Sequence, residues 1–236
     1  MGRNNYFRFK QFTIVHEKSG MKVGTDGVLI GAWSDHPAPQ RVLDIGSGSG
    51  LTPLMLAQRY PVEITGVEID PIAAAEAESN IAQSPWKERI SIVHTSIQEY
   101  KSSHSFDLIV SNPPFFQNGP TSPDPLRKRA RHTDSLSFED LMKSVATLLS
   151  ENGFFCVILP ANQIDYIINI GLHNKLYLNK VCYVRPKQDS APKRVMLRFC
   201  LHEKTRIIEE SLFIEKDRHL YSDDYISLTE EFYLKM

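Results

Sequence analysis

From residue 41 onward, short apolar runs rich in β-branched residues alternate with longer stretches of helix-like composition. This alternation predicts parallel strands, because two neighbouring strands that run in the same direction need a long crossover, which is usually a helix. The fold class is therefore α/β, with a mostly parallel seven-stranded sheet and helices on both faces. The predicted strands are 41–45, 63–68, 90–94, 106–111, 153–159, 176–184 and 194–201. The predicted helices are 51–60, 71–84, 137–150 and 161–174.

The length of 236 residues suits one well-cored domain. We expect a short N-terminal extension over residues 1–38, with a strand near 6–16 and a short helix in "TDGVLIGAW". The catalytic core is expected over 39–201. Residues 202–236 are a C-terminal elaboration, with a strand near 206–214 and a helix near 223–233.

The overall charge and the cysteines exclude several classes of protein. A net charge of -1 gives no global case for nucleic-acid binding, although a local basic patch can still provide it. The three cysteines have no C-x-x-C spacing, so neither a disulfide framework nor a metal site is expected. No apolar run is long enough to cross a bilayer. We therefore expect a cytoplasmic monomer that binds neither a metal nor a membrane.

A glycine-rich loop, "DIGSGSG", follows the first core strand and precedes a helix. Glycines permit positive φ angles and leave bare backbone against which a ligand can lie. Asp44 would repel a pyrophosphate but could bind a cationic amine, and Glu68 ends the next strand, where an acid can accept hydrogen bonds from a ribose diol. The alternative is a tight strand-to-helix turn with no ligand.

The loop and this acid resemble the first two motifs of the class I S-adenosylmethionine-dependent methyltransferases. The resemblance implies a Rossmann-like fold and S-adenosylmethionine as the cofactor. It also implies that Glu68 holds the ribose, and that the methionine moiety lies among Asp44, Gly46, Gly48 and Gly50. The family often has an Asp after the third strand for the adenine amino group. Here Ser96 stands at that position, so backbone or Gln98 is the alternative for this contact.

The fourth core strand ends in "NPPF", residues 112–115. Both prolines fix φ and lack an N–H, so the backbone leaves the sheet in a set shape. The Asn112 side chain and the Pro113 carbonyl could each accept a hydrogen bond from a conjugated amine, and Pro114 keeps that backbone rigid. Phe115 could stack on the ring that carries the amine. The alternative is a proline-rich turn. The motif resembles the N-P-P-[FYW] methyltransferases, which act on planar amines or amides.

Two further stretches, residues 7–33 and 129–142, together with "PKRVMLRF", resemble a narrower family. Its members are bacterial methyltransferases that modify the 6-amino group of the adenosine 3′ of the anticodon in a valine tRNA. The resemblance covers nearly the whole chain, and it implies that Lys22, Thr25 and Asp26 lie over the cofactor pocket. Judged from its neighbours alone, Asp26 could instead be the cap of a short helix.

A basic cluster lies on a proline-rich and serine-rich stretch after "NPPF", which we expect to be a long loop. Its cations could neutralise RNA phosphates, or they could form an ordinary solvated charge run. We favour contact with tRNA. The candidates are Arg127, Lys128, Arg129 and Arg131. The interleaved aromatics and bases of "YFRFKQF" could also touch RNA, but a half-buried strand explains them as well.

The expected function is methyl transfer from S-adenosylmethionine to the 6-amino group of adenine in tRNA. The motif alone leaves three alternatives: an rRNA guanine 2-amino methyltransferase, a protein glutamine methyltransferase, or a non-catalytic RNA-binding module. A release-factor glutamine enzyme would normally carry a helical N-terminal domain, and about 40 residues ahead of the first core strand leave no room for one.

Overall fold

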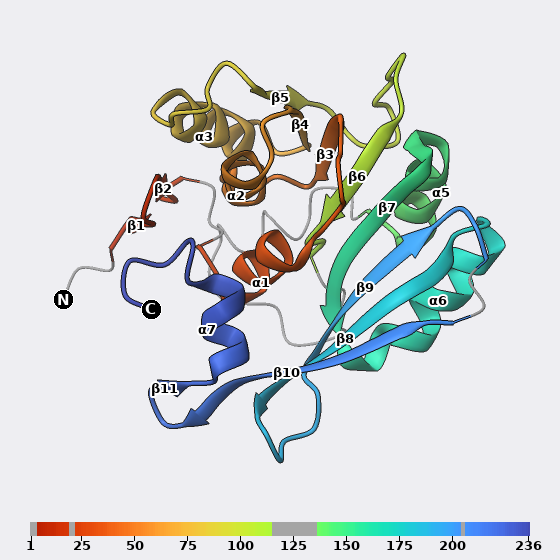
Figure 1. Cartoon of the computed structure of the whole chain (residues 1–236). Coiled ribbons are helices and arrows are strands. Elements are labelled where there is room, and N and C mark those ends of the chain that lie inside the picture. Colours follow the sequence, from red (N-terminus) through yellow and green to blue (C-terminus); the bar gives the residue numbers. More distant parts are fainter. Residues whose placement is uncertain (1–3, 19–21, 115–135, 204–205) are drawn as a thin grey trace.

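A single large sheet organises the protein, and its order places the candidate site. The computed structural model describes residues 4–18, 22–114, 136–203 and 206–236. Within these ranges the sheet has nine strands in the order β11-β10-β8-β9-β7-β6-β3-β4-β5 (Figure 1). The bounds are β3 Arg41–Ile45, β4 Glu63–Glu68, β5 Ile90–His94, β6 Phe106–Ser111, β7 Leu149–Pro160, β8 Tyr177–Lys187, β9 Arg194–Cys200, β10 Ile208–Asp217 and β11 Leu220–Tyr221.

The strand directions confirm the mostly parallel sheet. Strands β5, β4, β3, β6 and β7 pair in parallel, and β9 runs antiparallel to both β7 and β8. The sheet contains the seven expected strands and two more, because β10 adds in parallel to β8 and β11 pairs with β10. The chain builds β3, β4 and β5 outward in one direction and then returns to place β6 on the other side of β3. Ligands of α/β sheets bind at such a reversal of strand order.

Helices cover both faces of the sheet, as expected. The bounds are α1 Thr25–Trp33, α2 Leu51–Arg59, α3 Pro71–Ala82, α5 Phe138–Leu148, a 3-10 turn Ala161–Gln163, α6 Ile164–His173 and α7 Asp223–Thr229. One buried cluster joins α1, α2 and α7 to the sheet through residues such as Val28 and Leu54. A second cluster joins α5 and α6 to the opposite face through residues such as Leu141 and Ile167.

Helix α3 begins where the sequence predicts. The Asp70 carboxylate accepts hydrogen bonds from Ile72 N at 2.7 Å and Ala73 N at 3.1 Å, and Pro71 occupies the first helical position. This cap satisfies two of the N–H groups that a helix start leaves without intrahelical partners. The start of α3, close to the end of β4, is thereby fixed.

The N-terminal stretch expected as one strand over 6–16 is a hairpin of two, β1 Tyr6–Arg8 and β2 Thr13–Val15. The Phe9 and Phe12 rings stack with centroids 4.6 Å apart, and Phe9 N donates to Phe12 O, which reverses the chain between the strands. Both aromatics are buried. They pack into the core from the turn between the two strands, whereas Tyr6 of β1 is 54% exposed, and contact of this stretch with RNA stays a prediction.

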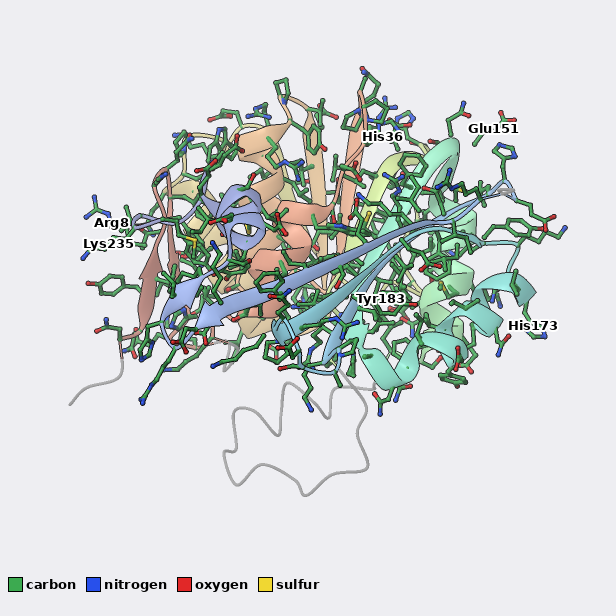
Figure 2. The ribbon with its side chains drawn as sticks, turned by 60° about the horizontal axis from the view of Figure 1, so that its bottom comes forward. Arg8, His36, Glu151, His173, Tyr183 and Lys235 are labelled. Carbon is green, nitrogen blue, oxygen red and sulfur yellow. The ribbon has the colours of Figure 1, made fainter. Side chains whose placement is uncertain are left out.

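The C-terminal residues hold the hairpin from its other side. Phe9 forms a bridge with Tyr233, and Lys10 N donates to Phe232 O at 2.8 Å. Figure 2 shows Arg8 and Lys235 at the same edge of the molecule. Residues 208–236 thus extend the sheet at one end and pack against the start of the chain at the other.

Candidate active site

The candidate site lies at the carboxyl edge of the parallel strands, where the strand order reverses. Ile45 of β3 is in register with Val67 of β4 and with Ser111 of β6. Ser111 Oγ also donates to Ile45 O at 2.9 Å, which ties the ends of β3 and β6 together. The glycine loop, Glu68 and Asn112 therefore leave the sheet at the same level, as the sequence predicts.

The glycine loop between β3 and α2 depends on positive φ angles. They are 78° at Gly46, 54° at Gly48 and 85° at Gly50. A Cβ at Gly46 or Gly48 would meet no atom within 4 Å, so bare backbone faces open space at these two positions. A Cβ at Gly50 would instead lie 3.3 Å from the Ala77 side chain of α3. Two glycines thus leave room for a ligand, and the third permits close packing.

Glu68 shapes this loop in addition to its predicted contact with a ribose. Its Oε2 accepts a hydrogen bond from Gly48 N at 2.7 Å, and its Oε1 accepts one from Asp70 N at 2.9 Å. The residue is only 8% exposed, and burial raises the pKa of its carboxyl above the ordinary value. Sequence reasoning missed this contact with the loop, since it joins residues 20 positions apart.

Asp44 presents a buried oxygen that has no partner among the described residues. It is 1% exposed, and its Oδ2 has no hydrogen bond. Burial raises the pKa of its carboxyl from the ordinary 3.8 to about 7, and the charge of Glu68 acts in the same direction. An unpaired buried carboxylate is costly unless a cation or a donor completes it. Together with the open space at Gly46 and Gly48, it fits the amine of S-adenosylmethionine.

Asn112 and the two prolines leave the end of β6 beneath helix α1. Asn112 and Pro114 are half-buried, and Pro113 is buried. A Cβ at Gly27 of α1 would lie 2.9 Å from Leu51 Cδ2 and 3.7 Å from Asn112 Nδ2. This glycine therefore makes room for the Leu51 side chain of α2, and the Asn112 side chain lies at ordinary contact distance from the same point of α1. The predicted stacking residue, Phe115, lies outside the described residues.

The first turn of α1 holds two of the three residues expected over the cofactor pocket. Thr25 is exposed, and so is Lys22 just before the helix. Asp26 Oδ2 accepts a hydrogen bond from Arg194 Nε at 2.7 Å, which forms an ion pair with the start of β9. The cap position of α1 is Gly24, with no side-chain hydrogen bond, so Asp26 is not the helix cap. This ion pair ties the start of α1 to β9 of the sheet.

Ser96 and Gln98 follow β5, on the far side of β4 from the glycine loop. Ser96 Oγ accepts a hydrogen bond from Glu99 N at 3.3 Å, and Ser96 O accepts one from Tyr100 N at 3.0 Å. The structure thus gives Ser96 a local role as the cap of a turn. A contact of Ser96 with adenine stays a prediction.

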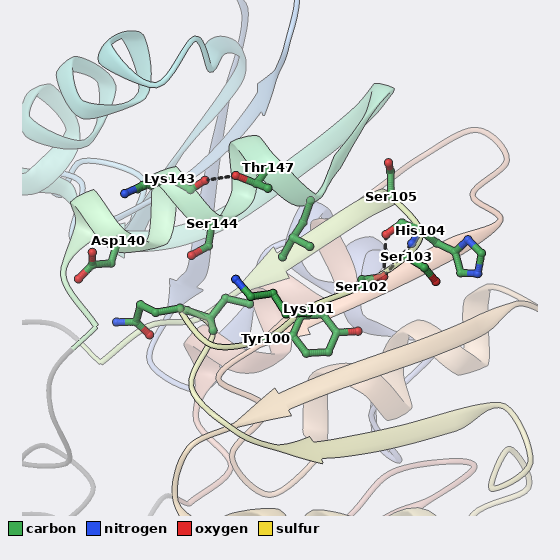
Figure 3. Close-up of a pocket in the computed structure, with 13 residues that line it drawn as sticks. Tyr100, Lys101, Ser102, Ser103, His104, Ser105, Asp140, Lys143, Ser144 and Thr147 are labelled. Carbon is green, nitrogen blue, oxygen red and sulfur yellow. Dashed lines mark hydrogen bonds between the residues drawn. The ribbon is translucent and has the colours of Figure 1, made fainter.

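A separate hollow of about 440 Å³ lies between the connection from β5 to β6 and helix α5 (Figure 3). Gln98, Lys101, His104 and Lys143 are among the residues around it. Apart from Gln98, the alternative for the adenine contact, none of the predicted site residues that the structure describes lines it, and Lys143 belongs to α5 rather than to the carboxyl edge of the sheet. The hollow is therefore not the candidate active site.

The basic cluster Arg127, Lys128, Arg129 and Arg131 also lies outside the described residues, so its contact with RNA stays a prediction. Among the residues that are described, no group of three or more His, Cys, Asp or Glu could hold a metal ion. The described helices include none with the length and apolar character needed to cross a membrane. The three cysteines are buried and unpaired.

Comparison with known proteins identifies close relatives. A profile of the methyltransferase small domain family matches residues 8–163. A tRNA1(Val) (adenine(37)-N6)-methyltransferase of Bacteroides fragilis is 46% identical over 234 residues, which cover 98% of each chain. A protein of the same name from Aeromonas hydrophila is 44% identical over 240 residues, covering both chains completely.

Solved structures share the fold at low sequence identity. A predicted O-methyltransferase from Agrobacterium tumefaciens has a TM-score of 0.66 at 17% identity, over 88% of this chain and 96% of that one. A glycopeptide N-methyltransferase in complex with S-adenosyl-L-methionine has a TM-score of 0.56 at 13% identity, over 77% of this chain and 100% of that one. At such identities the likeness shows the fold alone.

Proposed function

This chain belongs to the family of tRNA1(Val) (adenine(37)-N6)-methyltransferases, and from that premise we infer that it methylates the 6-amino group of an adenine in tRNA. The proposed target is the adenosine directly 3′ of the anticodon of a valine tRNA. One observation carries the assignment of the site. The glycine loop and Asn112 leave neighbouring strands at one edge, with the ends of β3 and β6 joined by the Ser111 hydrogen bond.

S-adenosylmethionine is the cofactor, and when bound it supplies a methyl group activated by a sulfonium. We assign its amine to Asp44, whose buried Oδ2 lacks a partner within the described part of the chain. The open backbone at Gly46 and Gly48 leaves room for the methionine moiety, and Glu68 is assigned to the ribose. Lys22 and Thr25, before and at the start of α1, are proposed to close the pocket from above, with Asp26 pinned by Arg194.

Asn112 is proposed to hold the amine that receives the methyl group. Its Oδ1 and the Pro113 carbonyl would each accept one hydrogen bond from the amine, which favours a more tetrahedral nitrogen with its lone pair directed at the methyl group. Pro113 and Pro114 keep this backbone from adapting to other partners. Phe115 is proposed to stack on the adenine ring. Stacking of a base on an aromatic side chain contributes about 1–3 kcal/mol to the binding free energy.

A methylation assay on defined RNA tests the proposed substrate. The purified protein is incubated with S-adenosylmethionine and an unmodified valine tRNA transcript, and the digested nucleosides are analysed by mass spectrometry. We expect N6-methyladenosine, and none when the adenosine 3′ of the anticodon is replaced by guanosine. Methylated guanine in rRNA, or methylated protein glutamine, would replace this assignment by one of its rivals.

We predict that affinity for S-adenosylmethionine depends on pH through Asp44. With a pKa of about 7 in the folded chain, Asp44 carries a proton at pH 6 that the unfolded chain, with its value near 3.8, has already lost. The unliganded protein therefore loses stability as pH rises from 4 to 7. A bound cation needs the carboxylate, so affinity should fall by up to about tenfold for each pH unit below 7.

Calorimetry in two buffers of different ionisation enthalpy checks this prediction, because it counts the protons released on binding. Proton release close to pH 6 should disappear in Asp44→Asn, which keeps the side-chain shape but cannot ionise. An affinity that does not change between pH 5 and 7 would exclude Asp44 as the group that binds the amine.

The basic cluster provides a prediction about RNA affinity. Replacing Arg127, Lys128 and Arg129 with alanine should reduce the slope of log K against log salt by about 2, since each neutralised single-strand phosphate contributes about 0.7. Filter binding of the tRNA measures the slope. The salt concentration is varied between about 50 and 200 mM, a range over which the affinity of nucleic-acid-binding proteins usually falls strongly. An unchanged slope would leave these residues as a solvated charge run.

Three wider expectations stay proposals: that the enzyme works in the cytoplasm, as a monomer, and without a metal ion. The organisation into an N-terminal extension, residues 1–38, a core, residues 39–201, and a C-terminal elaboration, residues 202–236, is likewise proposed. Sedimentation of the protein with and without tRNA tests the oligomeric state directly.

A further inference from the structure

Asn80 of helix α3 is a buried polar residue that the chemistry above does not use. Its side chain is 2% exposed and makes three hydrogen bonds. Asn80 Nδ2 donates to Val15 O and to Ser49 O, both at 2.8 Å, and Asn80 Oδ1 accepts from Val15 N at 2.9 Å. The amide thus pairs with both main-chain groups of Val15, as a neighbouring strand would, and its second N–H remains for the glycine loop.

The partners of Asn80 belong to two segments that are far apart in the sequence. Val15 is the last residue of β2 in the N-terminal hairpin, and Ser49 lies between two of the glycines of the cofactor loop. A hydrogen bond from Asn80 Nδ2 to each carbonyl therefore joins the hairpin to the loop through one side chain. If the hairpin moves, the Asn80 side chain and the Ser49 carbonyl bonded to it must move as well, and the reverse holds for the loop.

Other contacts fix the position of the hairpin independently of the glycine loop. One turn before Asn80, Glu76 Oε1 accepts a hydrogen bond from Lys18 N at 2.7 Å, just beyond β2. On the opposite side, Lys10 N donates to Phe232 O, and Phe9 bridges to Tyr233. Because the hairpin is fixed on both sides, the Asn80 amide is held in place and can restrain the loop.

We propose that Asn80 is a positioning residue for cofactor binding, which holds the Ser49 carbonyl of the glycine loop at a fixed distance from the N-terminal hairpin. This inference rests on the proposed function, because it assumes that S-adenosylmethionine binds at the glycine loop. Gly48 directly precedes Ser49, and Gly46 lies three positions before it. The backbone conformation at these two glycines therefore depends on where Ser49 is held. The hairpin thereby contributes to the affinity for a ligand that it need not touch.

Only an amide can satisfy this arrangement. Ser49 O and Val15 O need donors, whereas Val15 N needs an acceptor. Aspartate would have no N–H to offer either carbonyl, and alanine would leave all three main-chain groups without this partner. Buried main-chain groups without partners are rare because they are costly.

The test compares two asparagines in the purified full chain. Asn80→Ala should weaken calorimetric binding of S-adenosylmethionine by about tenfold, which equals about 1.4 kcal/mol. It should raise the KM for S-adenosylmethionine more than the KM for tRNA. The control is Asn179→Ala on β8, because Asn179 is also buried, at 8% exposed, and its Oδ1 accepts from Arg198 Nε at 2.8 Å. The control should lower the melting temperature without a comparable loss of affinity.

Hydrogen exchange provides a second test, and its wild-type measurement does not depend on a variant folding. S-adenosylmethionine should slow exchange at the Val15 amide as well as in the glycine loop. In Asn80→Ala the effect on Val15 should disappear. An unaltered affinity in Asn80→Ala, or a Val15 amide that does not respond to the cofactor in the wild type, would overturn the role of Asn80. Failure of the wild-type protein to bind S-adenosylmethionine would instead contradict the proposed function.

Discussion

Replacing Asn112 with alanine should lower the rate of methyl transfer by about 100-fold or more, as the loss of one preorganised polar group commonly does. The substitution removes the side-chain oxygen proposed to hold the amine, while the Pro113 carbonyl remains. The glycine loop, Asp44 and Glu68 make their described contacts without Asn112. Affinity for S-adenosylmethionine should therefore stay within about twofold of the wild type, or roughly 0.4 kcal/mol.

Single-turnover kinetics with the valine tRNA measures the first quantity, and calorimetry measures the second. Asn112→Asp is the matched control, because aspartate keeps an acceptor oxygen at the same place and should retain more activity than alanine. Turnover near the wild-type rate in Asn112→Ala would remove Asn112 from the reaction and return "NPP" to the status of a rigid turn.

Replacing Glu68 with alanine should raise the dissociation constant of S-adenosylmethionine by about 100-fold, or about 2.8 kcal/mol. Two effects combine in this variant. The ribose loses its proposed charged acceptor, and Gly48 N loses the acceptor at 2.7 Å that holds the loop. Asp70 N loses its partner as well, so the melting temperature should fall.

Calorimetric titration with S-adenosylmethionine checks this prediction. Glu63→Ala is the control, because Glu63 begins the same strand and is exposed. Wild-type affinity in Glu68→Ala would exclude Glu68 from the binding pocket. Glu68→Gln keeps a hydrogen-bond acceptor but removes the charge. If this variant binds S-adenosylmethionine more tightly than Glu68→Ala does, the difference measures the contribution of the hydrogen bonds without the charge.

The sequence predicts the centre of the fold well because local signals there agree. The strands at 41–45, 63–68, 90–94 and 106–111 have the predicted bounds. Three of these runs are followed by a residue that ends a strand or starts a helix: Gly46 after the first, Asp70 after the second and Pro113 after the fourth. The same signals place the glycine loop and Asn112 at one edge, because parallel strands end on one side of a sheet.

The periphery of the fold is predicted less well, because its structure depends on contacts between residues that are far apart in the sequence. The aromatics of residues 6–12 continue through the turn, and the antiparallel pairing of Tyr6–Arg8 with Thr13–Val15 shows two strands. The Asp26 to Arg194 pair joins residues 168 positions apart, and the Asn80 to Val15 pair joins residues 65 apart. Asn80 is not singled out in the sequence analysis, although the signal that could have found it is a polar residue in an alanine-rich helix, "AAAEAESNIA".

The substrate required information that the motif does not contain. "NPPF" predicts a planar amine or amide and leaves adenine, guanine and glutamine open. Similarity over nearly the full length to relatives named as tRNA adenine methyltransferases favours adenine among them. Two of the stretches that carry the narrower resemblance in the sequence, 7–33 and 129–142, lie outside the core strands.

The bridge between Phe9 and Tyr233 also affects how the chain is completed during synthesis. A ribosome adds about 5–20 residues per second, so on the order of tens of seconds separate the emergence of these two residues. Throughout that time Phe9 lacks the aromatic neighbour that covers it in the finished protein. The hairpin around Phe9 can therefore reach its final packing only after the residues near Tyr233 have been made.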